Sequence, residues 1–482
     1  MSMDEPQAVT RGAQVAPGEL RHYRGLSLVA AVLMMGAQVP AQADEVSELA
    51  DQVEALAAVV AQQATEIEAL RAALSRVAMQ TEADAIGAPA PDQEDDAIDI
   101  LLVDPEQPLG RFPDAAIITA GDFEGAIKIP DSQASVRLGG FVRAEGSFDF
   151  DSLGFQDVVN HRRIPLDGTP EDSASQSRFH VRNSRFNIDY RRPVPVGELR
   201  AFLEFDFFGG GDEFINNYEV RIRHVAAQVG NFYVGQWWSQ FTDIAASPET
   251  VDFGPPLGQP VLRNPGLRWV KDVGTEGVWR YGFGVENPAG DLTDTQDLFA
   301  SDAVPNVTGF VEANRDWGRV RVAALALRLD SDEDDTFAGG LNVTGRINTP
   351  WFADRDNIVF GLSGGEGFTH YFSVFAGAGL EGVISADGSV EATEILGGYI
   401  GYQHWWSEDW RSTFVASAVD LDAPDGSLGS AFESGERYRM NLFWTPQRDI
   451  TLGLELSYAA QETFDGSEGD GTRLNAVATI DF

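Results

Sequence analysis

The chain has 482 residues, no cysteine and a formal net charge of −41, with 75 Asp and Glu residues against 34 Lys and Arg residues. Without cysteine, disulfides and thiolate metal sites are excluded. The mean hydropathy of −0.18 is that of a soluble protein, yet the sequence has 30 Phe, 10 Trp and 50 Gly. A membrane β-barrel combines these properties, because its lipid-facing residues occupy alternate strand positions only.

Residues 1–43 are predicted to be a polar prefix followed by a signal peptide. The apolar stretch from Leu26 to Gly36 is too short to span a bilayer, and it follows Arg21 and Arg24. Ala41-Gln42-Ala43 lies just downstream, so the order is that of a secretory signal with cleavage after Ala43. The alternative is a buried helix, which the basic flank and the small residues disfavour. The sequence therefore predicts export.

A heptad repeat in residues 44–79 predicts a coiled-coil oligomerisation helix, because its core positions alternate steps of three and four. The core residues are Val46, Leu49, Val53, Leu56, Val60, Gln63, Ile67, Leu70, Leu74 and Val77. β-Branched residues at a with Leu at d favour two chains, although Gln63 at a d position can fix another register. A single amphipathic helix docked on the protein is the alternative, but docking needs no strict 3.5-residue period.

Residues 80–130 are predicted to be an acidic, Pro-rich linker, since no apolar period emerges before Ala134. Residues 131–482 contain about sixteen predicted strands, whose connections alternate between short and long. Short periplasmic turns alternating with long outer loops are typical of outer-membrane barrels. We therefore predict an all-β, antiparallel transmembrane β-barrel of about sixteen strands in the bacterial outer membrane. The coiled-coil helix and the flexible linker would lie in the periplasm.

The last predicted strand ends on an aromatic residue. From Leu474 to Phe482 the even-numbered positions are apolar, and the sequence stops at Phe482. An aromatic carboxyl terminus on a strand resembles the assembly signal of outer-membrane barrels. Because this strand must end on the periplasmic side, its parity makes 240–260 the third outer loop. Tryptophans near short turns, such as Trp410 and Trp444, fit an interfacial girdle.

Arginine is frequent at the polar strand positions. These side chains are expected to face the lumen, because a charge on the lipid face at the midplane costs about 2–4 kcal/mol. A bulge would let both Arg182 and Arg185 face inward. We predict a basic pore wall of Arg182, Arg185, Arg221, Arg223, Arg268 and Arg280. The alternative is that these arginines only neutralise lumen carboxylates such as Glu204, Asp206 and Glu286.

The third long loop differs from the others. The segment from Pro248 to Pro256 is too apolar and too rich in proline for a solvated outer loop. In porins the third loop folds into the lumen and forms the constriction. We predict that Asp243, Glu249, Asp252 and Phe253 belong to such a loop, with the three carboxylates facing the early-strand arginines across a transverse field. The alternative is a loop that packs over a neighbouring subunit.

Several segments of the predicted barrel share the pattern of one known family. They are Ile129 to Phe141, Ser184 to Asp189, Gly197 to Gly209, Arg221 to His224, Val234 to Trp237, Pro248 to Gly254 and Glu286 to Pro288. In these segments the chain resembles the DcaP-like outer-membrane porin family. The resemblance implies trimeric, sixteen-stranded channels with an N-terminal coiled coil and a preference for small anionic solutes, including dicarboxylates. The resemblance therefore implies a trimer, whereas the heptad pattern alone favours a dimer.

We therefore predict an outer-membrane porin for passive diffusion of small, dicarboxylate-like anions. The expected partners are the other chains of a homotrimer, outer-membrane lipid and lipopolysaccharide, anionic solutes, and peptidoglycan. No enzyme, cofactor, metal or nucleic-acid partner is predicted, because no nucleophile motif accompanies His224, His370 or His404, and the sequence has no zinc-ligand spacing, phosphate loop or nucleic-acid patch. The alternative function is a structural anchor whose periplasmic coiled coil contacts peptidoglycan.

Overall fold

The computed structural model describes residues 119–482, except for 156, 211–215, 217, 275–277, 295–299, 302, 332–333, 351–352, 386–387 and 425. The predicted signal peptide, the coiled coil and most of the linker lie outside the described residues. Within them the helical elements are the 3-10 turns η1 (His161–Arg163), η2 (Ile244–Ala246) and η4 (Thr369–Tyr371). No helix in the described part is long and apolar enough to cross a membrane.

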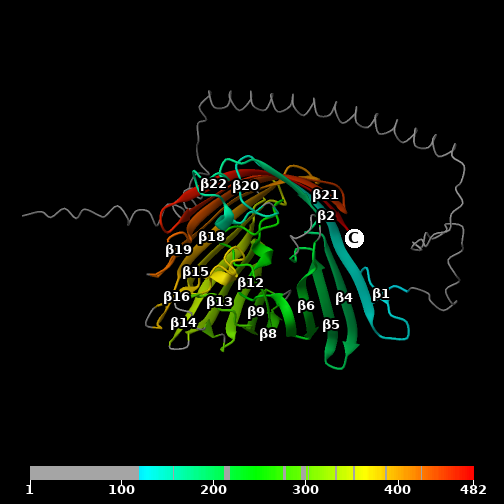
Figure 1. Ribbon diagram of the computed structural model, residues 1–482. Coiled ribbons are helices and arrows are strands. Elements are labelled where there is room, and N and C mark those ends of the chain that lie inside the picture. The colour runs from blue at the N-terminus through cyan, green and yellow to red at the C-terminus, as the bar shows by residue number, and fades with distance from the viewer. Residues whose placement is uncertain are drawn as a thin grey trace, which may run out of the picture. The chain divides into compact units, whose positions relative to one another are not determined.

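Long antiparallel strands form the wall of a closed barrel (Figure 1). The wall strands are β2 (Ser135–Asp149), β3 (Gln176–His180), β4 (Arg185–Val194), β5 (Gly197–Asp206), β6 (Arg221–Val229), β7 (Phe232–Trp238), β8 (Arg263–Val273), β9 (Trp279–Glu286), β12 (Asn306–Arg315), β13 (Gly318–Ser331), β14 (Asp335–Asn348), β15 (Asn357–Glu366), β18 (Glu394–Trp405), β19 (Trp410–Asp422), β20 (Phe432–Gln447), β21 (Ile450–Thr463) and β22 (Glu468–Asp481).

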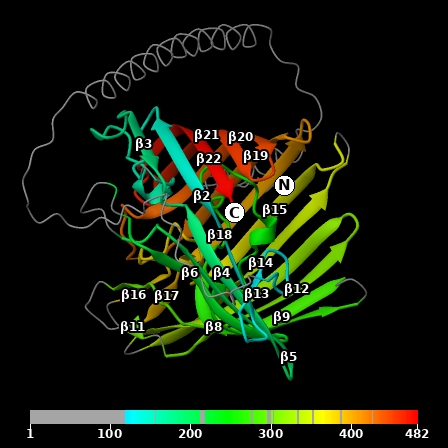
Figure 2. The ribbon, with the colours of Figure 1, turned by 90° about the vertical axis from the view of Figure 1, so that its right-hand side faces the viewer.

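The barrel closes where its first and last wall strands pair. β22 runs antiparallel to β2, with Asp481 opposite Phe141 at one end and Arg473 opposite Asp149 at the other, and the two strands lie side by side in Figure 2. β3 and β4 both pair with β2 and are two halves of one wall strand, so the barrel has sixteen strands. The predicted all-β, sixteen-stranded antiparallel barrel is therefore confirmed.

Five shorter strands lie outside this wall pattern. β1 (Ile127–Lys128) pairs with the beginning of β2, and β11 (Ala300–Ser301) pairs with the end of β13. A separate three-stranded sheet consists of β10 (Thr293–Asp294), β16 (Gly382–Ile384) and β17 (Val390–Ala392). Because its strands come from the connections β9–β12 and β15–β18, this small sheet joins two of the long loops.

Alternating side chains explain why these sequences form a barrel wall. In β21, Leu454 and Leu456 are exposed on the outside, whereas Glu455 and Ser457, which alternate with them, are only 1% exposed. An outward apolar row and an inward polar row are what a strand between lipid and a polar lumen requires. The outer face of the barrel is therefore apolar although the mean hydropathy of the chain is low.

As predicted, short turns join the strands at one end of the barrel and longer loops join them at the other end, except that two of the outer connections are short. The turns between β4 and β5 (195–196) and between β6 and β7 (230–231) are short, while the third loop (239–262) and the sixth loop (367–393) on the opposite end are long. Two further outer connections are short hairpins, from Ser331 to Asp335 and from Thr463 to Glu468. The predicted alternation of short and long connections was therefore wrong at these two outer connections, because the flanking strand pairs continue almost to the turn.

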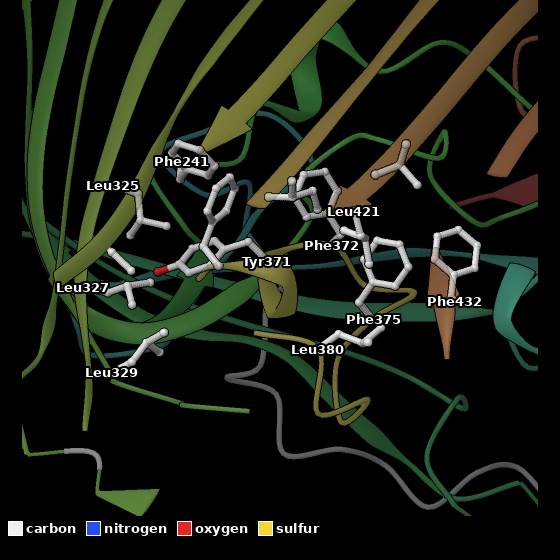
Figure 3. Close-up of a cluster of buried hydrophobic side chains, with 14 of the residues drawn as sticks. Phe241, Leu325, Leu327, Leu329, Tyr371, Phe372, Phe375, Leu380, Leu421 and Phe432 are labelled. Atoms are coloured by element: carbon white, nitrogen blue, oxygen red, sulfur yellow. The ribbon is translucent and has the colours of Figure 1, made fainter. Parts of the chain in front are cut away.

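A hydrophobic cluster lies inside the barrel rather than between two layers (Figure 3). The sixth loop contributes Phe368, Tyr371, Phe372 and Phe375, and the third loop contributes Phe241. They pack against the inner face of the barrel wall, where Leu325, Leu327 and Leu329 of β13 lie. Loops three and six are thus held together inside the barrel against this part of β13.

Candidate functional site

The third loop is fastened along the inner wall of the barrel by its own backbone. Inward side chains of three different strands donate hydrogen bonds to its carbonyls. Asn342 of β14 donates to Phe241 at 2.8 Å, Tyr399 of β18 to Ala246 at 3.2 Å, and Asn441 of β20 to Glu249 at 2.9 Å. Since buried carbonyls need partners, these bonds fix the path of the loop.

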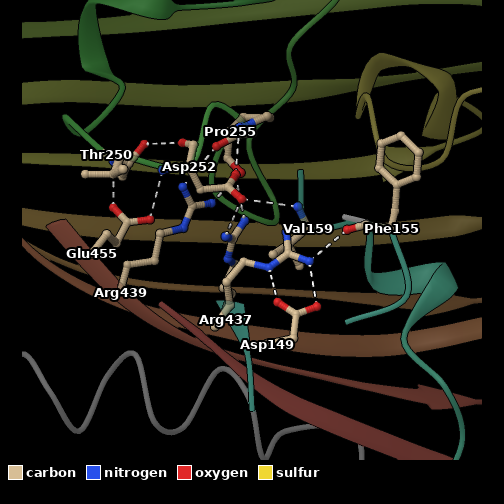
Figure 4. Close-up of polar contacts among 12 residues, drawn as sticks. Asp149, Phe155, Val159, Thr250, Asp252, Pro255, Arg437, Arg439 and Glu455 are labelled. Atoms are coloured by element: carbon tan, nitrogen blue, oxygen red, sulfur yellow. Dashed lines mark hydrogen bonds and ion pairs between the residues drawn. The ribbon is translucent and has the colours of Figure 1, made fainter. Parts of the chain in front are cut away.

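The tip of the loop is held by charged side chains of β20 and β21 (Figure 4). The Glu455 carboxylate accepts the backbone N–H of Val251 at 2.8 Å and that of Asp252 at 3.1 Å. The Arg439 guanidinium donates to the carbonyls of Gly254 and Pro255 at 2.9 and 2.6 Å. Hydrogen bonds to ionised groups are stronger than neutral ones, so this part of the loop is strongly anchored.

One glycine contact shows how closely the loop lies on the wall. Gly258 has a φ of +84°, and a Cβ built there would lie 2.4 Å from the carbonyl oxygen of Ala418 and 2.5 Å from the amide nitrogen of Gly398. A Cβ on Gly397 would in turn lie 2.7 Å from the Cα of Gly258. The backbone of the loop therefore rests directly on β18 and β19, with no room for a side chain between them.

Each acidic residue predicted for the constriction has an arginine partner from a later strand. Asp243 pairs with Arg319 of β13 at 3.0 Å. Glu249 accepts two bonds from Arg411 of β19, at 2.7 and 2.5 Å. Asp252 pairs with Arg437 of β20 at 3.2 Å. The prediction that these carboxylates face the early-strand arginines is thus corrected, because the loop lies against the late-strand side of the interior.

The environment of Asp252 keeps its carboxylate ionised. Burial alone would raise its pKa, but the positive charges of Arg437, Arg439 and Arg473 outweigh burial and hold the pKa below its ordinary value. Asp252 also accepts the backbone N–H of Val159 from the first loop at 3.2 Å. A charge that is surrounded by arginines therefore fastens the first and third loops to the same wall.

Phe253 is the part of the third loop that meets the early-strand arginines. The centre of its ring lies 5.4 Å from the guanidinium carbon of Arg143, 5.3 Å from that of Arg185 and 5.8 Å from that of Arg223. Arginines over an aromatic face are attracted by its negative π-density. The loop thus presents an uncharged ring, rather than a carboxylate, to the predicted basic wall.

Five of the six predicted wall arginines form ion pairs, and three of them pair with carboxylates of β5. Arg221 binds Asp206 in two-point geometry at 2.9 and 2.7 Å. Arg223 donates to Glu204 and Asp206, each at 2.8 Å, and Arg185 lies 3.5 Å from Glu204. The alternative interpretation was that the arginines only neutralise lumen carboxylates. It holds for Glu204 and Asp206, which both pair with arginines.

Arg182 lies at the break between β3 and β4, where a bulge had been predicted. Its guanidinium pairs with Asp157 of the first loop and also donates to the carbonyl of Gly209 at 2.8 Å. Phe208 lies beneath it, with the ring centre 4.5 Å away. The interruption between β3 and β4 thus lets both arginines reach carboxylates inside the barrel. Arg182 pairs with Asp157 of the first loop, whereas Arg185 lies near Glu204 of β5.

The last two predicted wall residues lie apart from this group. Arg268 is buried, donates to the carbonyl of Trp238 and lies near the carbonyl of Asn264 at 3.5 Å. Arg280 is at the short-turn end of β9 and lies 3.7 Å from the exposed Asp272. The six arginines therefore do not form one continuous wall.

Sequence reasoning missed several arginines that contact the third loop. They are Arg143, Arg319, Arg321, Arg411, Arg437 and Arg439. All lie at inward positions of their strands. In β20, for example, Arg437, Arg439 and Asn441 occupy every second position and are buried, while the residues between them face outward. Strand parity alone could have identified them as lumen residues, but not as partners of this loop.

A closed sixteen-stranded barrel with short turns at one end and a long loop fastened inside is the fold of an outer-membrane channel of the porin type. Residues 123–279 match the DcaP outer membrane protein family. The predicted resemblance to this family is therefore confirmed.

Two solved structures illustrate the similarity in fold to different degrees. The crystal structure of the outer membrane channel DcaP of Acinetobacter baumannii aligns over 73% of this chain and 98% of that chain, with 23% sequence identity and a TM-score of 0.64. Outer-membrane expressed OmpT of Vibrio cholerae aligns over 73% of this chain and 99% of that chain, with 12% identity and a TM-score of 0.48. The search among curated proteins found no match.

Proposed function

We propose that this barrel is a trimeric channel through which small anionic solutes, such as dicarboxylates, diffuse passively. The narrow part of the path would lie between Phe253 of the third loop and the arginines of the early strands. The observation that carries the proposal is the position of Phe253, whose ring faces Arg143, Arg185 and Arg223 together. A solute at this point would meet guanidinium groups without an opposing carboxylate of the loop.

The charge balance around Phe253 supports an anion preference. The loop carboxylates Asp243 and Glu249 pair with arginines of later strands and are directed away from this point. Around the ring, the carboxylates Glu145, Glu204 and Asp206 pair with a larger number of arginines. Those arginines are Arg143, Arg185, Arg221 and Arg223. An excess of positive charge in a confined, poorly solvated space raises the local concentration of anions.

The net charge of −41 does not oppose this proposal. Many acidic residues lie in the predicted linker and in the outer connections around 330–335 and 462–470. At moderate salt, charges farther away than about 10 Å are largely screened. The field at the narrow part is therefore set by the groups that line it, not by the total charge of the chain.

The trimer and the inward loop belong to the same proposal. The contacts of the third loop with β14, β18, β20 and β21 of its own barrel support a constricting role over packing on a neighbouring subunit. The family resemblance supports three chains. In planar bilayers, a trimeric channel is expected to show conductance steps in groups of three, whereas a pure anchor would show none.

Reversal potentials in a salt gradient test the anion preference. The double variant Arg221→Ala, Arg223→Ala removes two positive charges and leaves Asp206 and Glu204 with fewer partners, so its reversal potential should shift toward cations. Arg315→Ala is a control for the loss of an arginine elsewhere, because Arg315 lies at the short-turn end and contacts Trp279 rather than the narrow part. An unchanged reversal potential in a folded double variant would refute the proposed path.

A further inference from the structure

A second group of arginines surrounds a pocket that lies away from the proposed narrow part. The pocket has a volume of about 510 Å³ and lies between the third loop and the short-turn ends of the later strands. Ser247, Pro248 and Glu249 form its side toward the loop. Its remaining lining includes Arg346, Arg355, Asn357, Gln403, Trp405, Glu408, Arg411, Thr445 and Arg448. Its size is that of a site for a small solute.

The arginines of this pocket differ in their partners. The Glu249 carboxylate binds Arg411 at two points, and Arg411 also donates to the Thr445 hydroxyl at 2.8 Å. Among the described residues, Arg346, Arg355 and Arg448 form no ion pair. All three guanidinium groups border the same pocket and are solvent-exposed. They are therefore available to a ligand.

The positions of these arginines on the fold bring them together. Arg346 lies near the end of β14, Arg355 in the turn before β15, and Arg448 in the turn between β20 and β21. Arg355 is stacked on Trp405, with its guanidinium carbon 3.3 Å from the ring centre. Stacking restricts the guanidinium plane, so at least one of the three is already oriented. The convergence of separate turns on one pocket is not required by the barrel wall itself.

The chemistry of the pocket indicates its ligand. A guanidinium presents a planar fork that matches a carboxylate at two points, and several guanidinium groups favour a ligand with more than one carboxylate. Asn357, Gln403, Thr413 and Thr451 add polar groups for the remaining oxygens of such a ligand. Glu408 is the other carboxylate of the lining besides the paired Glu249, so positive charge exceeds negative charge.

We propose that this pocket is a binding site for small multivalent carboxylates on the short-turn side of the third loop. The proposal rests on the proposed function, because a solute that crosses the narrow part reaches this side of the loop. Binding here has to be weak enough for release, as in any conducting pore. A solute held in the pocket would reduce the flow of smaller ions while it stays.

Single-channel recording with propane-1,2,3-tricarboxylate as the probe tests the site. In potassium chloride, the probe added to the short-turn side should interrupt the current of the wild-type channel at lower concentration than on the other side. The triple variant Arg346→Gln, Arg355→Gln, Arg448→Gln should raise the half-blocking concentration at least about threefold, because the probe loses three guanidinium partners. Arg315→Gln removes one arginine outside the pocket and is the control for Arg448→Gln, so it should leave the half-blocking concentration unchanged.

The outcomes separate this proposal from the proposed function. Equal half-blocking concentrations in the wild type and in the folded triple variant would refute the pocket while leaving the anion preference intact. Equal block by inorganic phosphate and by the tricarboxylate would refute the carboxylate assignment. Reversal potentials without the probe test the anion preference separately. If the triple variant does not fold, Arg448→Gln alone should shift the block in the same direction, and no shift would count against the site.

Discussion

The Phe253 ring centre lies 5.3 Å from the guanidinium carbon of Arg185, and Arg185 in turn lies 3.5 Å from the Glu204 carboxylate. The tip of the third loop and an early wall strand therefore meet through an aromatic ring and a cation. The loop backbone next to this ring is fixed from the opposite side by Glu455 and Arg439. The ring is thus held at a defined place by groups that it does not contact.

Removing this ring should widen the path. Phe253→Ala is expected to increase the single-channel conductance, because the loop backbone remains anchored by Glu455 and Arg439 while the side chain between them and the arginines is lost. Phe283→Ala, on the exposed outer face of β9, removes a ring of the same size and serves as control. Equal conductance of Phe253→Ala and the wild type in planar bilayers would show that the ring does not narrow the path.

A buried ion pair next to the barrel seam should contribute strongly to stability. Arg473 of β22 binds Asp149 of β2 with one contact at 2.9 Å, and both side chains are only 1% exposed. Asp149→Ala leaves the buried Arg473 charge without its partner. The free energy of unfolding, measured in urea, should therefore fall by about 3–5 kcal/mol. Asp122→Ala breaks the solvent-exposed pair with Lys128 and should lower the free energy of unfolding much less, because exposed ion pairs contribute little to stability. Similar losses for the two variants would contradict this.

The wall of the barrel could be predicted from the sequence because its signal is local. Each strand alternates an outward apolar residue with an inward one, as Leu454 and Glu455 do, and closure requires the last strand to meet the first. The two short hairpins at 331–335 and 463–468 were missed, because acidic and glycine-rich sequences can continue a strand when a partner strand supplies the hydrogen bonds.

The interior of the barrel could not be predicted in the same way. Asp243, Glu249 and Asp252 are close in sequence, but their partners Arg319, Arg411 and Arg437 lie on three different strands. A loop inside a barrel can reach any inward side chain, so the pattern of a strand does not say which arginine it meets. The aromatic cluster of the sixth loop was missed for the same reason. Phe368, Tyr371, Phe372 and Phe375 follow a helical i, i+3, i+4, i+7 spacing, but that spacing does not say which part of the barrel interior the rings meet.

The ion pair of Glu249 and Arg411 permits a test in which two variants should shift the reversal potential in opposite directions. Glu249→Gln removes a negative charge and frees the guanidinium that it holds at 2.7 and 2.5 Å, so the reversal potential should shift further toward anions. Arg411→Gln frees the carboxylate instead and should shift it toward cations. The bond from Asn441 to the Glu249 carbonyl is kept in both variants. Shifts of the same sign would mean that displacement of the loop, not charge, determines the change.

His161 of the first loop should make the docking of that loop sensitive to acid. The imidazole is only 2% exposed, and burial, together with the positive charges of Arg437 and Arg439 on β20, lowers its pKa to about 3 from an ordinary 6.5, against a smaller opposing effect of Asp252. Once undocked, the ring would take up a proton below pH 6.5, so the docked loop has its full stability above that pH and loses it as the pH falls toward 3.

Deuterium exchange of residues 150–175, corrected for intrinsic rates, measures this effect. Between pH 6.5 and 4.5 the docked state of the wild type should lose up to about 3 kcal/mol, because each unit of pH is worth at most about 1.4 kcal/mol for one proton. His161→Gln carries no titrating group and should remove most of the difference between the two pH values. If that variant keeps the full acid-induced increase in exchange, another group, such as Asp157 between Arg178 and Arg182, must control the loop.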